Sequence, residues 1–182
     1  MRTQLSRFIL WLTGWKVVGT FPDYKKYIII VCPHTSNWDF VLGKLGFFSN
    51  GKTGKMLIKK EFFRFPIKWL LLKVGGVPVD RLNSTSSINK LIKIIKDADE
   101  FILTITPEGT RKKTKNWKTG FYFISEKAEL PIIIGKIDYK HKELIMMHEF
   151  IKTGNVEEDM KTIKSYYKES YPKYPENFTA ED

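Results

Sequence analysis

The sequence predicts an α/β fold, in which a mostly parallel or mixed central sheet is flanked by helices and preceded by an N-terminal amphipathic helix. Short apolar runs of strand length alternate with stretches whose apolar residues recur at helical spacing, as in βα units. The 182 residues contain no repeat, low-complexity linker or change in composition. A hydrophobic share of 42% is enough for one core and too low for a bundle of membrane-spanning helices. We therefore expect a single domain over residues 1–182.

The first expected helix lies within residues 1–20. Leu5, Phe8, Ile9 and Leu12 fall at helical spacing, with tryptophans and basic residues beside them. The apolar run is far shorter than the roughly 20 residues that span a bilayer, and no small-residue cleavage site follows it. Two interpretations remain open. The helix packs on the core, or it lies in the membrane interface with its basic residues on acidic lipid.

The expected strands are the apolar runs that lie between turn signals. They cover residues Tyr27–Cys32, Lys55–Ile58, Gly76–Val79, Phe101–Ile105, Ile132–Ile137 and Glu143–Met147. Further helices are expected from about Phe40, after a cap at Ser84 or Thr85, and after Asn155, where an acidic first turn begins. The tail 172–182 carries two prolines and is expected to be loose.

Residues 46–53 fit the nucleotide P-loop pattern, but we reject this match. A true P-loop leaves a strand and enters a helix. Here the motif follows an expected helix and precedes an expected strand. We expect a turn over residues 49–54 instead.

The chain is strongly basic, with a formal net charge of +11. An excess of this size indicates an anionic partner, such as nucleic acid, an acidic membrane, a phosphorylated substrate or an acidic carrier protein. Cys32 is the only cysteine, so no intrachain disulfide can form, which suits a reducing compartment.

Polar residues follow three of the expected strands. His34 and Asp39 come after the first strand with four residues between them, Arg81 follows the third, and Glu108 and Arg111 follow the fourth. Because the carboxyl ends of parallel strands share one rim, we expect these side chains to face one crevice. A histidine oriented by a carboxylate can act as a general base, and guanidinium groups suit phosphate oxygens.

Each of these residues also has a structural explanation. Ser36 and Asp39 fit a helix capping box, and the two arginines fit surface ion pairs. Glu108 could be the structural partner of an arginine. Cys32 fits a small buried hydrophobe better than a nucleophile. His141 and His148 lack ligand spacing, and we expect no metal site.

The set of motifs resembles the glycerolipid acyltransferase family, typified by lysophosphatidic acid acyltransferase. The likeness extends from about Ile28 to Ile137, and four motifs in the right order are far more specific than one. The motifs are the HX4D arrangement His34–Asp39, then Val79–Arg81, Pro107–Arg111 and Leu130–Ile134.

This resemblance implies an O-acyltransferase of phospholipid biosynthesis. It would move a fatty acyl group from acyl-CoA or acyl-carrier protein to the free hydroxyl of a lysophospholipid, by default 1-acylglycerol-3-phosphate. His34 would be the general base, oriented by Asp39. The substrate-binding residues would be Arg81, Glu108, Gly109, Thr110 and Arg111, and the apolar stretch 62–74 would line a slot for the acyl chain.

The resemblance also implies no cofactor besides the acyl thioester co-substrate. The expected location is peripheral, at the cytoplasmic face of the cell membrane, with residues 1–20 on an anionic membrane surface and no nucleic acid bound. Two alternatives remain: a non-catalytic basic module that binds lipid or nucleic acid, and a thioesterase in which water replaces the acceptor.

Overall fold

The computed structural model describes residues 1–80 and 84–181. The strands are β1 (Lys16–Val18), β2 (Lys26–Cys32), β3 (Gly54–Lys59), β4 (Gly76–Val79), β5 (Phe101–Ile105), β6 (Ile132–Asp138) and β7 (Glu143–Phe150). The helices are α1 (Arg2–Leu12), α2 (Trp38–Ser49), α3 (Ile67–Lys73), α4 (Ser84–Asp97), α5 (Gly120–Ala128) and α6 (Val156–Ser165), with the short 3-10 turns η1 (Lys60–Phe62) and η2 (Pro175–Asn177).

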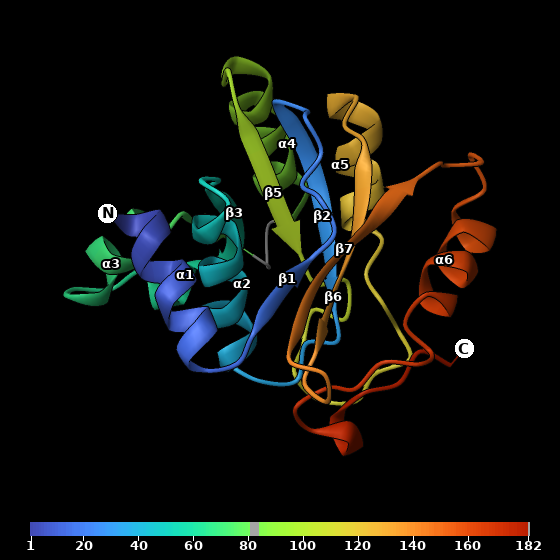
Figure 1. The fold of residues 1–182 in the computed structure, drawn as a ribbon. Coiled ribbons are helices and arrows are strands. Elements are labelled where there is room, and N and C mark those ends of the chain that lie inside the picture. The colour runs from blue at the N-terminus through green and yellow to red at the C-terminus, as the bar shows by residue number, and fades with distance from the viewer. Residues whose placement is uncertain (81–83, 182) are drawn as a thin grey trace.

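All of these strands form one sheet in the order β1-β7-β6-β2-β5-β3-β4 (Figure 1). The pairs on either side of β2 are parallel, as are β3–β4 and β3–β5. Among the strands of the described residues, β6–β7 is the one antiparallel pair, and β1 pairs in parallel with β7. The predicted α/β class with a mixed central sheet flanked by helices is therefore confirmed, including its N-terminal helix.

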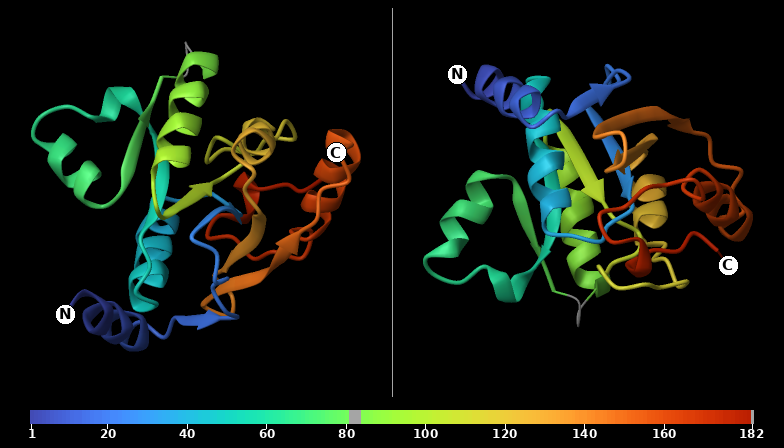
Figure 2. Two further views of the ribbon diagram at one scale, coloured as in Figure 1. Left: turned by 90° about the horizontal axis from the view of Figure 1, so that it is seen from above. Right: turned by 60° about the horizontal axis from the view of Figure 1, so that its bottom comes forward.

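The central strand β2 is buried on both faces, which explains why it is a continuous apolar run. Ile28 and Ile30 face the core formed with α4, α5 and α6, whereas Tyr27 and Ile29 face the side covered by α2. Leu10 of α1 completes the packing on that second side. Figure 2 shows these two helical layers with the sheet between them.

Several local predictions are confirmed and others need correction. The P-loop-like residues end α2 and turn into β3, as expected. Three short elements, β1, α3 and α5, were not predicted from the sequence. The tail was predicted to be loose, but Thr179 and Ala180 are buried and the Phe178 ring lies 6.3 Å from that of Trp117. The apolar residues of the tail cover an indole that would otherwise face water.

No helix in the described ranges is both long and apolar enough to cross a membrane.

Candidate active site

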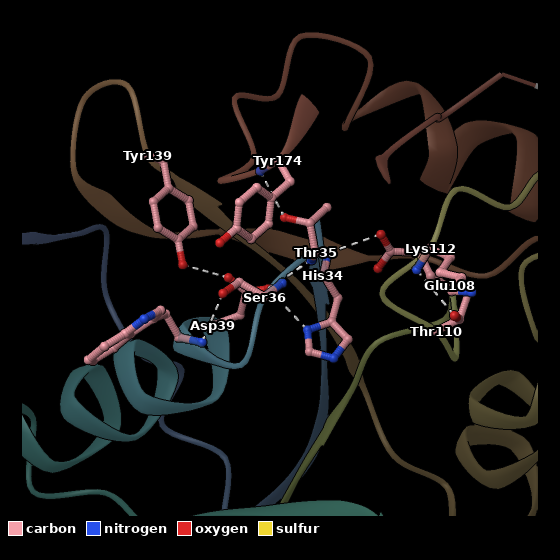
Figure 3. Close-up of polar contacts among 10 residues, drawn as sticks. His34, Thr35, Ser36, Asp39, Glu108, Thr110, Lys112, Tyr139 and Tyr174 are labelled. Atoms are coloured by element: carbon pink, nitrogen blue, oxygen red, sulfur yellow. Dashed lines mark hydrogen bonds and ion pairs between the residues drawn. The ribbon is translucent and has the colours of Figure 1, made fainter. Parts of the chain in front are cut away.

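The candidate site lies at the carboxyl ends of three adjacent strands. His34 follows β2, Glu108 follows β5 and Tyr139 follows β6. Because β2 lies between β5 and β6 in the sheet, the two neighbouring strands bring their end residues to either side of the histidine. Figure 3 shows Glu108 on one side of His34 and the Asp39–Tyr139 pair on the other.

His34 and Asp39 form a hydrogen-bonded pair. Nδ1 of His34 lies 3.1 Å from Oδ2 of Asp39, which is itself only 5% exposed. An ionised carboxylate can only accept, so this bond places the proton of a neutral imidazole on Nδ1 and leaves Nε2 as an acceptor. The imidazole is 23% exposed and can therefore be reached by a ligand.

Asp39, in the first turn of α2, also binds the loop that precedes this helix. Its Oδ2 accepts hydrogen bonds from the backbone N–H groups of Thr35 and Ser36, both at 2.8 Å. The N–H of Trp38 donates to Oγ of Ser36 at 3.2 Å. The capping role and the contact with His34 were expected to be compatible, and one carboxylate oxygen binds both the imidazole and the two N–H groups before α2.

Tyr139 is a member of the site that the sequence analysis missed. Its hydroxyl donates to the other carboxylate oxygen of Asp39, Oδ1, at 2.6 Å. Burial, and then this hydrogen bond, raise the pKa of Tyr139 well above its usual value, so the hydroxyl stays protonated and remains a donor. The only sequence signal was a tyrosine directly after an apolar strand.

Glu108 holds the backbone of His34. Its Oε1 accepts the N–H of His34 at 3.0 Å, and the residue is 5% exposed. Burial raises the pKa of Glu108 to about 7, against the opposing effect of the hydrogen bond from His34. Glu108 was weighed as the structural partner of an arginine, but the hydrogen bond that it accepts comes from the backbone of His34. It is not among the residues that line the neighbouring pocket.

Cys32 is buried next to this carboxylate. Burial, followed by the charge of Glu108, raises the pKa of the thiol well above its ordinary value. Since the thiolate is the nucleophilic form, Cys32 is an inert core residue.

An open pocket of about 350 Å³ lies beside the pair and is lined by Thr35, Ser36, Asn37, Trp38, Arg111 and Tyr174. The structure thus places Arg111 in one pocket with Thr35 and Ser36, which follow His34 directly in the chain. Gly109 has a φ of +63°, which favours glycine, and its N–H donates to the carbonyl oxygen of Thr106. Thr110 accepts a hydrogen bond from the N–H of Lys112, so both residues shape the loop that presents Arg111.

Arg81 lies outside the described residues. Tyr174 was missed because it belongs to a tail without a recognisable motif. Within the described ranges, no group of three or more His, Cys, Asp or Glu residues could hold a metal ion.

The fold and the site define an α/β protein with a histidine–carboxylate pair at a strand-to-helix junction. Residues 15–134, well over half of the chain, match the model of the family described as Acyltransferase. The chain belongs to this acyltransferase family, which confirms the prediction of an acyltransferase.

The solved structures include one with the same fold, the 1-acyl-sn-glycerophosphate (LPA) acyltransferase PlsC from Thermotoga maritima. It has a TM-score of 0.63 and 20% sequence identity, and the match covers 94% of this chain and 80% of that one. The comparison with curated protein sequences finds no match.

Replacing Glu108 with glutamine is expected to stabilise the protein only at higher pH. An amide oxygen can still accept the His34 N–H, but it carries no charge to bury. The pKa of Glu108 is about 7 in the folded protein, against an ordinary value of 4.5. The protonated carboxyl therefore contributes to stability below pH 4.5, and this contribution is lost as the pH rises through 7. The free energy of unfolding of Glu108→Gln should exceed that of the wild type by on the order of 2 kcal/mol at pH 8 and by little at pH 5.

Urea unfolding at the two pH values measures this difference. Glu100→Gln, at an exposed glutamate, is the matched control and should show no such pH dependence. A Glu108→Gln effect of equal size at both pH values would contradict the raised pKa.

Proposed function

We propose that the protein transfers a fatty acyl group from acyl-CoA or acyl-carrier protein to the free hydroxyl of a lysophospholipid, with 1-acylglycerol-3-phosphate as the first candidate. The observation that carries the proposal is the 3.1 Å bond between His34 and Asp39, beside a pocket that Arg111 lines. Membership of the acyltransferase family supports it.

The proposed mechanism uses the free nitrogen of His34. Nε2 accepts the proton of the acceptor hydroxyl while the oxygen attacks the thioester carbonyl. Collapse of the tetrahedral intermediate expels the thiolate, which takes the proton from the imidazolium. Asp39 fixes the tautomer and stabilises the imidazolium as it forms. Arg111 holds the acceptor phosphate with a forked pair of hydrogen bonds, and Arg81 is proposed to assist it.

Tyr139 is a positioning residue in this mechanism. It holds Oδ1 of Asp39 while Oδ2 holds the imidazole, so the plane of the carboxylate is fixed. By donating a hydrogen bond it also withdraws part of the negative charge that would otherwise stabilise the imidazolium.

The membrane surface is proposed as the place of action, peripherally and at the cytoplasmic face. α1 has one buried side, through Leu10, and exposes Leu5, Phe8, Trp11 and Leu12. Packing on the core and the proposed contact with the membrane would therefore use different sides of the same helix. We propose that α1 lies on anionic lipid, because the basic residues Arg2, Arg7 and Lys16 lie near its exposed apolar residues.

A second apolar element projects from the same flank of the molecule (Figures 1 and 2). We call residues 60–73, which comprise η1 and α3, the α3 arm. Residues 62–74 were expected to line a slot for the acyl chain, but Phe65 is 89% exposed and Trp69 78% exposed. Phe62, Ile67, Leu70 and Leu72 are exposed as well. Apolar side chains interleaved with Lys60, Arg64, Lys68 and Lys73 suit an anionic bilayer surface.

Replacing His34 with alanine tests the enzyme activity. The variant should lose about 10²–10⁴-fold in kcat because the general base is gone, and it should still fold and bind vesicles. The measurement is acyl transfer to a panel of lysolipids with both thioester donors. His148→Ala is the control and should keep wild-type turnover, because this ring on β7 packs edge-to-face against Tyr166, away from the site.

An unchanged rate in His34→Ala would rule out this mechanism. Release of free fatty acid by the wild type that ignores added lysolipid would favour a thioesterase. Steeply salt-dependent DNA binding with no acyl transfer would favour a nucleic-acid module.

Replacing Tyr139 with phenylalanine should move the acid limb of the pH–activity profile to higher pH, with about a three- to tenfold loss of kcat. The lost donor leaves more negative charge on Asp39, which favours the imidazolium, and allows the carboxylate to rotate. The pH dependence of kcat/KM measures the shift. Tyr24→Phe, at an exposed tyrosine bonded to Glu149, is the control. A profile that merely drops without moving would mean that Tyr139 is only structural.

Replacing Trp69 with serine should weaken binding to vesicles that contain an anionic phospholipid by about tenfold, because an indole no longer enters the interface. Sedimentation with vesicles measures the affinity, and activity on a short-chain soluble acceptor should be retained. Phe123→Ser, at an exposed aromatic residue on α5, provides the control. Equal losses for both variants would refute a specific role for the α3 arm.

A further inference from the structure

We infer that the C-terminal segment 171–175 is part of the active site, where Lys173 and Tyr174 bind a phosphate monoester group of a substrate. This inference rests on the proposed acyl transfer and deepens it. The segment lies outside residues 15–134, which match the family model, and outside all four motifs.

The segment is attached to the strand ends that build the site. The carbonyl oxygen of Tyr171 accepts the N–H of Tyr139 at 2.8 Å. The N–H of Tyr174 donates to Oγ1 of Thr35 at 3.3 Å. Figure 3 shows the Tyr174 ring between Tyr139 and Thr35. The segment is thus bonded on one side to the residue that holds Asp39 and on the other to the loop that follows His34.

Tyr174 forms a wall of the pocket. It lines the pocket together with Trp38 and Arg111, so an aromatic ring from the tail and a guanidinium from the loop after β5 border the same space. Both rings are accessible, since Trp38 is 57% exposed and Tyr174 42% exposed. A ligand that reaches Arg111 would therefore also touch the tail.

Lys173 places a second positive charge close to Trp38 and Tyr174, two of the aromatic residues that line the pocket. Its Nζ lies 5.5 Å from the centre of the Trp38 ring and 5.9 Å from the centres of the Tyr139 and Tyr174 rings. Cation–π attraction to three rings restrains a side chain that would otherwise be mobile. These contacts use the charge of the ammonium and leave its N–H groups able to donate to an anion.

A phosphate monoester is the anion that suits this arrangement. It carries up to two negative charges on three terminal oxygens, which matches a planar guanidinium together with an ammonium. Two substrates of the proposed reaction contain such a group: the acceptor 1-acylglycerol-3-phosphate and the 3′-phosphate of an acyl-CoA donor. The aromatic walls suit the less polar parts of either molecule.

Steady-state kinetics of Lys173→Gln and Lys173→Arg test the inference and identify the source. The first comparison is between 1-acylglycerol-3-phosphate and monoacylglycerol as acceptors at saturating donor. The second comparison is between acyl-CoA and acyl-dephospho-CoA as donors. In one of the two comparisons, Lys173→Gln should raise the KM of the substrate that carries the phosphate monoester about tenfold, with kcat within twofold of wild type. The KM of the analogue that lacks this phosphate should not change. Lys173→Arg should retain most of the affinity.

The comparison in which KM changes shows whether the bound phosphate belongs to the acceptor or to the donor. Lys93→Gln, at an exposed lysine on α4, is the matched control for loss of one positive charge. Equal KM values for wild type and Lys173→Gln in both comparisons would overturn the inference, as would an equal effect of Lys93→Gln.

A binding measurement separates this inference from the proposed function. Glycerol 3-phosphate and adenosine 3′,5′-bisphosphate are titrated against the protein while tryptophan fluorescence is followed, with Trp38→Phe to identify the responding indole. We expect at least one probe to bind, and Lys173→Gln to weaken it about tenfold. A wild type without any acyl transfer would refute the proposed function yet leave this result interpretable. Binding of neither probe, or binding unaffected by Lys173→Gln, would refute the phosphate site.

Discussion

The hydrogen bonds converging on the buried carboxylate of Asp39 are the constraint on which the site depends. Two backbone N–H groups, one phenol and one imidazole meet at its two oxygens. A buried carboxylate is costly unless it is bonded in this way, so each donor has little freedom to move. The loop from β2 to α2, the first turn of α2 and the residue after β6 are therefore fixed relative to one another.

The sheet topology explains why so few residues are needed to build this arrangement. A parallel sheet directs the ends of its strands toward one rim, and β2 pairs in parallel with both of its neighbours, β5 and β6. Glu108 arrives from one neighbour and Tyr139 from the other without any long loop. The apolar interior of the strands supplies stability, while the chemistry is confined to the first few residues beyond them.

The sequence predicts what depends on local patterns. Strand β2 and the pairing of His34 with Asp39 follow from an apolar run and a spacing. Tyr139 and Tyr174 could not be predicted, because their relation to Asp39 and Thr35 depends on strand order and on the path of the tail. The exposure of Phe65 and Trp69 was missed because apolar composition by itself does not distinguish a slot lining from a protruding arm. The prediction for Arg81 falls outside the described residues.

The burial of Cys32 has a practical consequence. It is the only thiol of the chain, it is inaccessible to solvent, and its raised pKa keeps it protonated. Maleimide and nitroxide reagents require an accessible thiolate, so the wild-type protein provides a silent background for labelling. A cysteine introduced into an exposed helix could then carry a spin probe or a fluorophore, and depth in a bilayer could be read out by spectroscopy without removing a native residue.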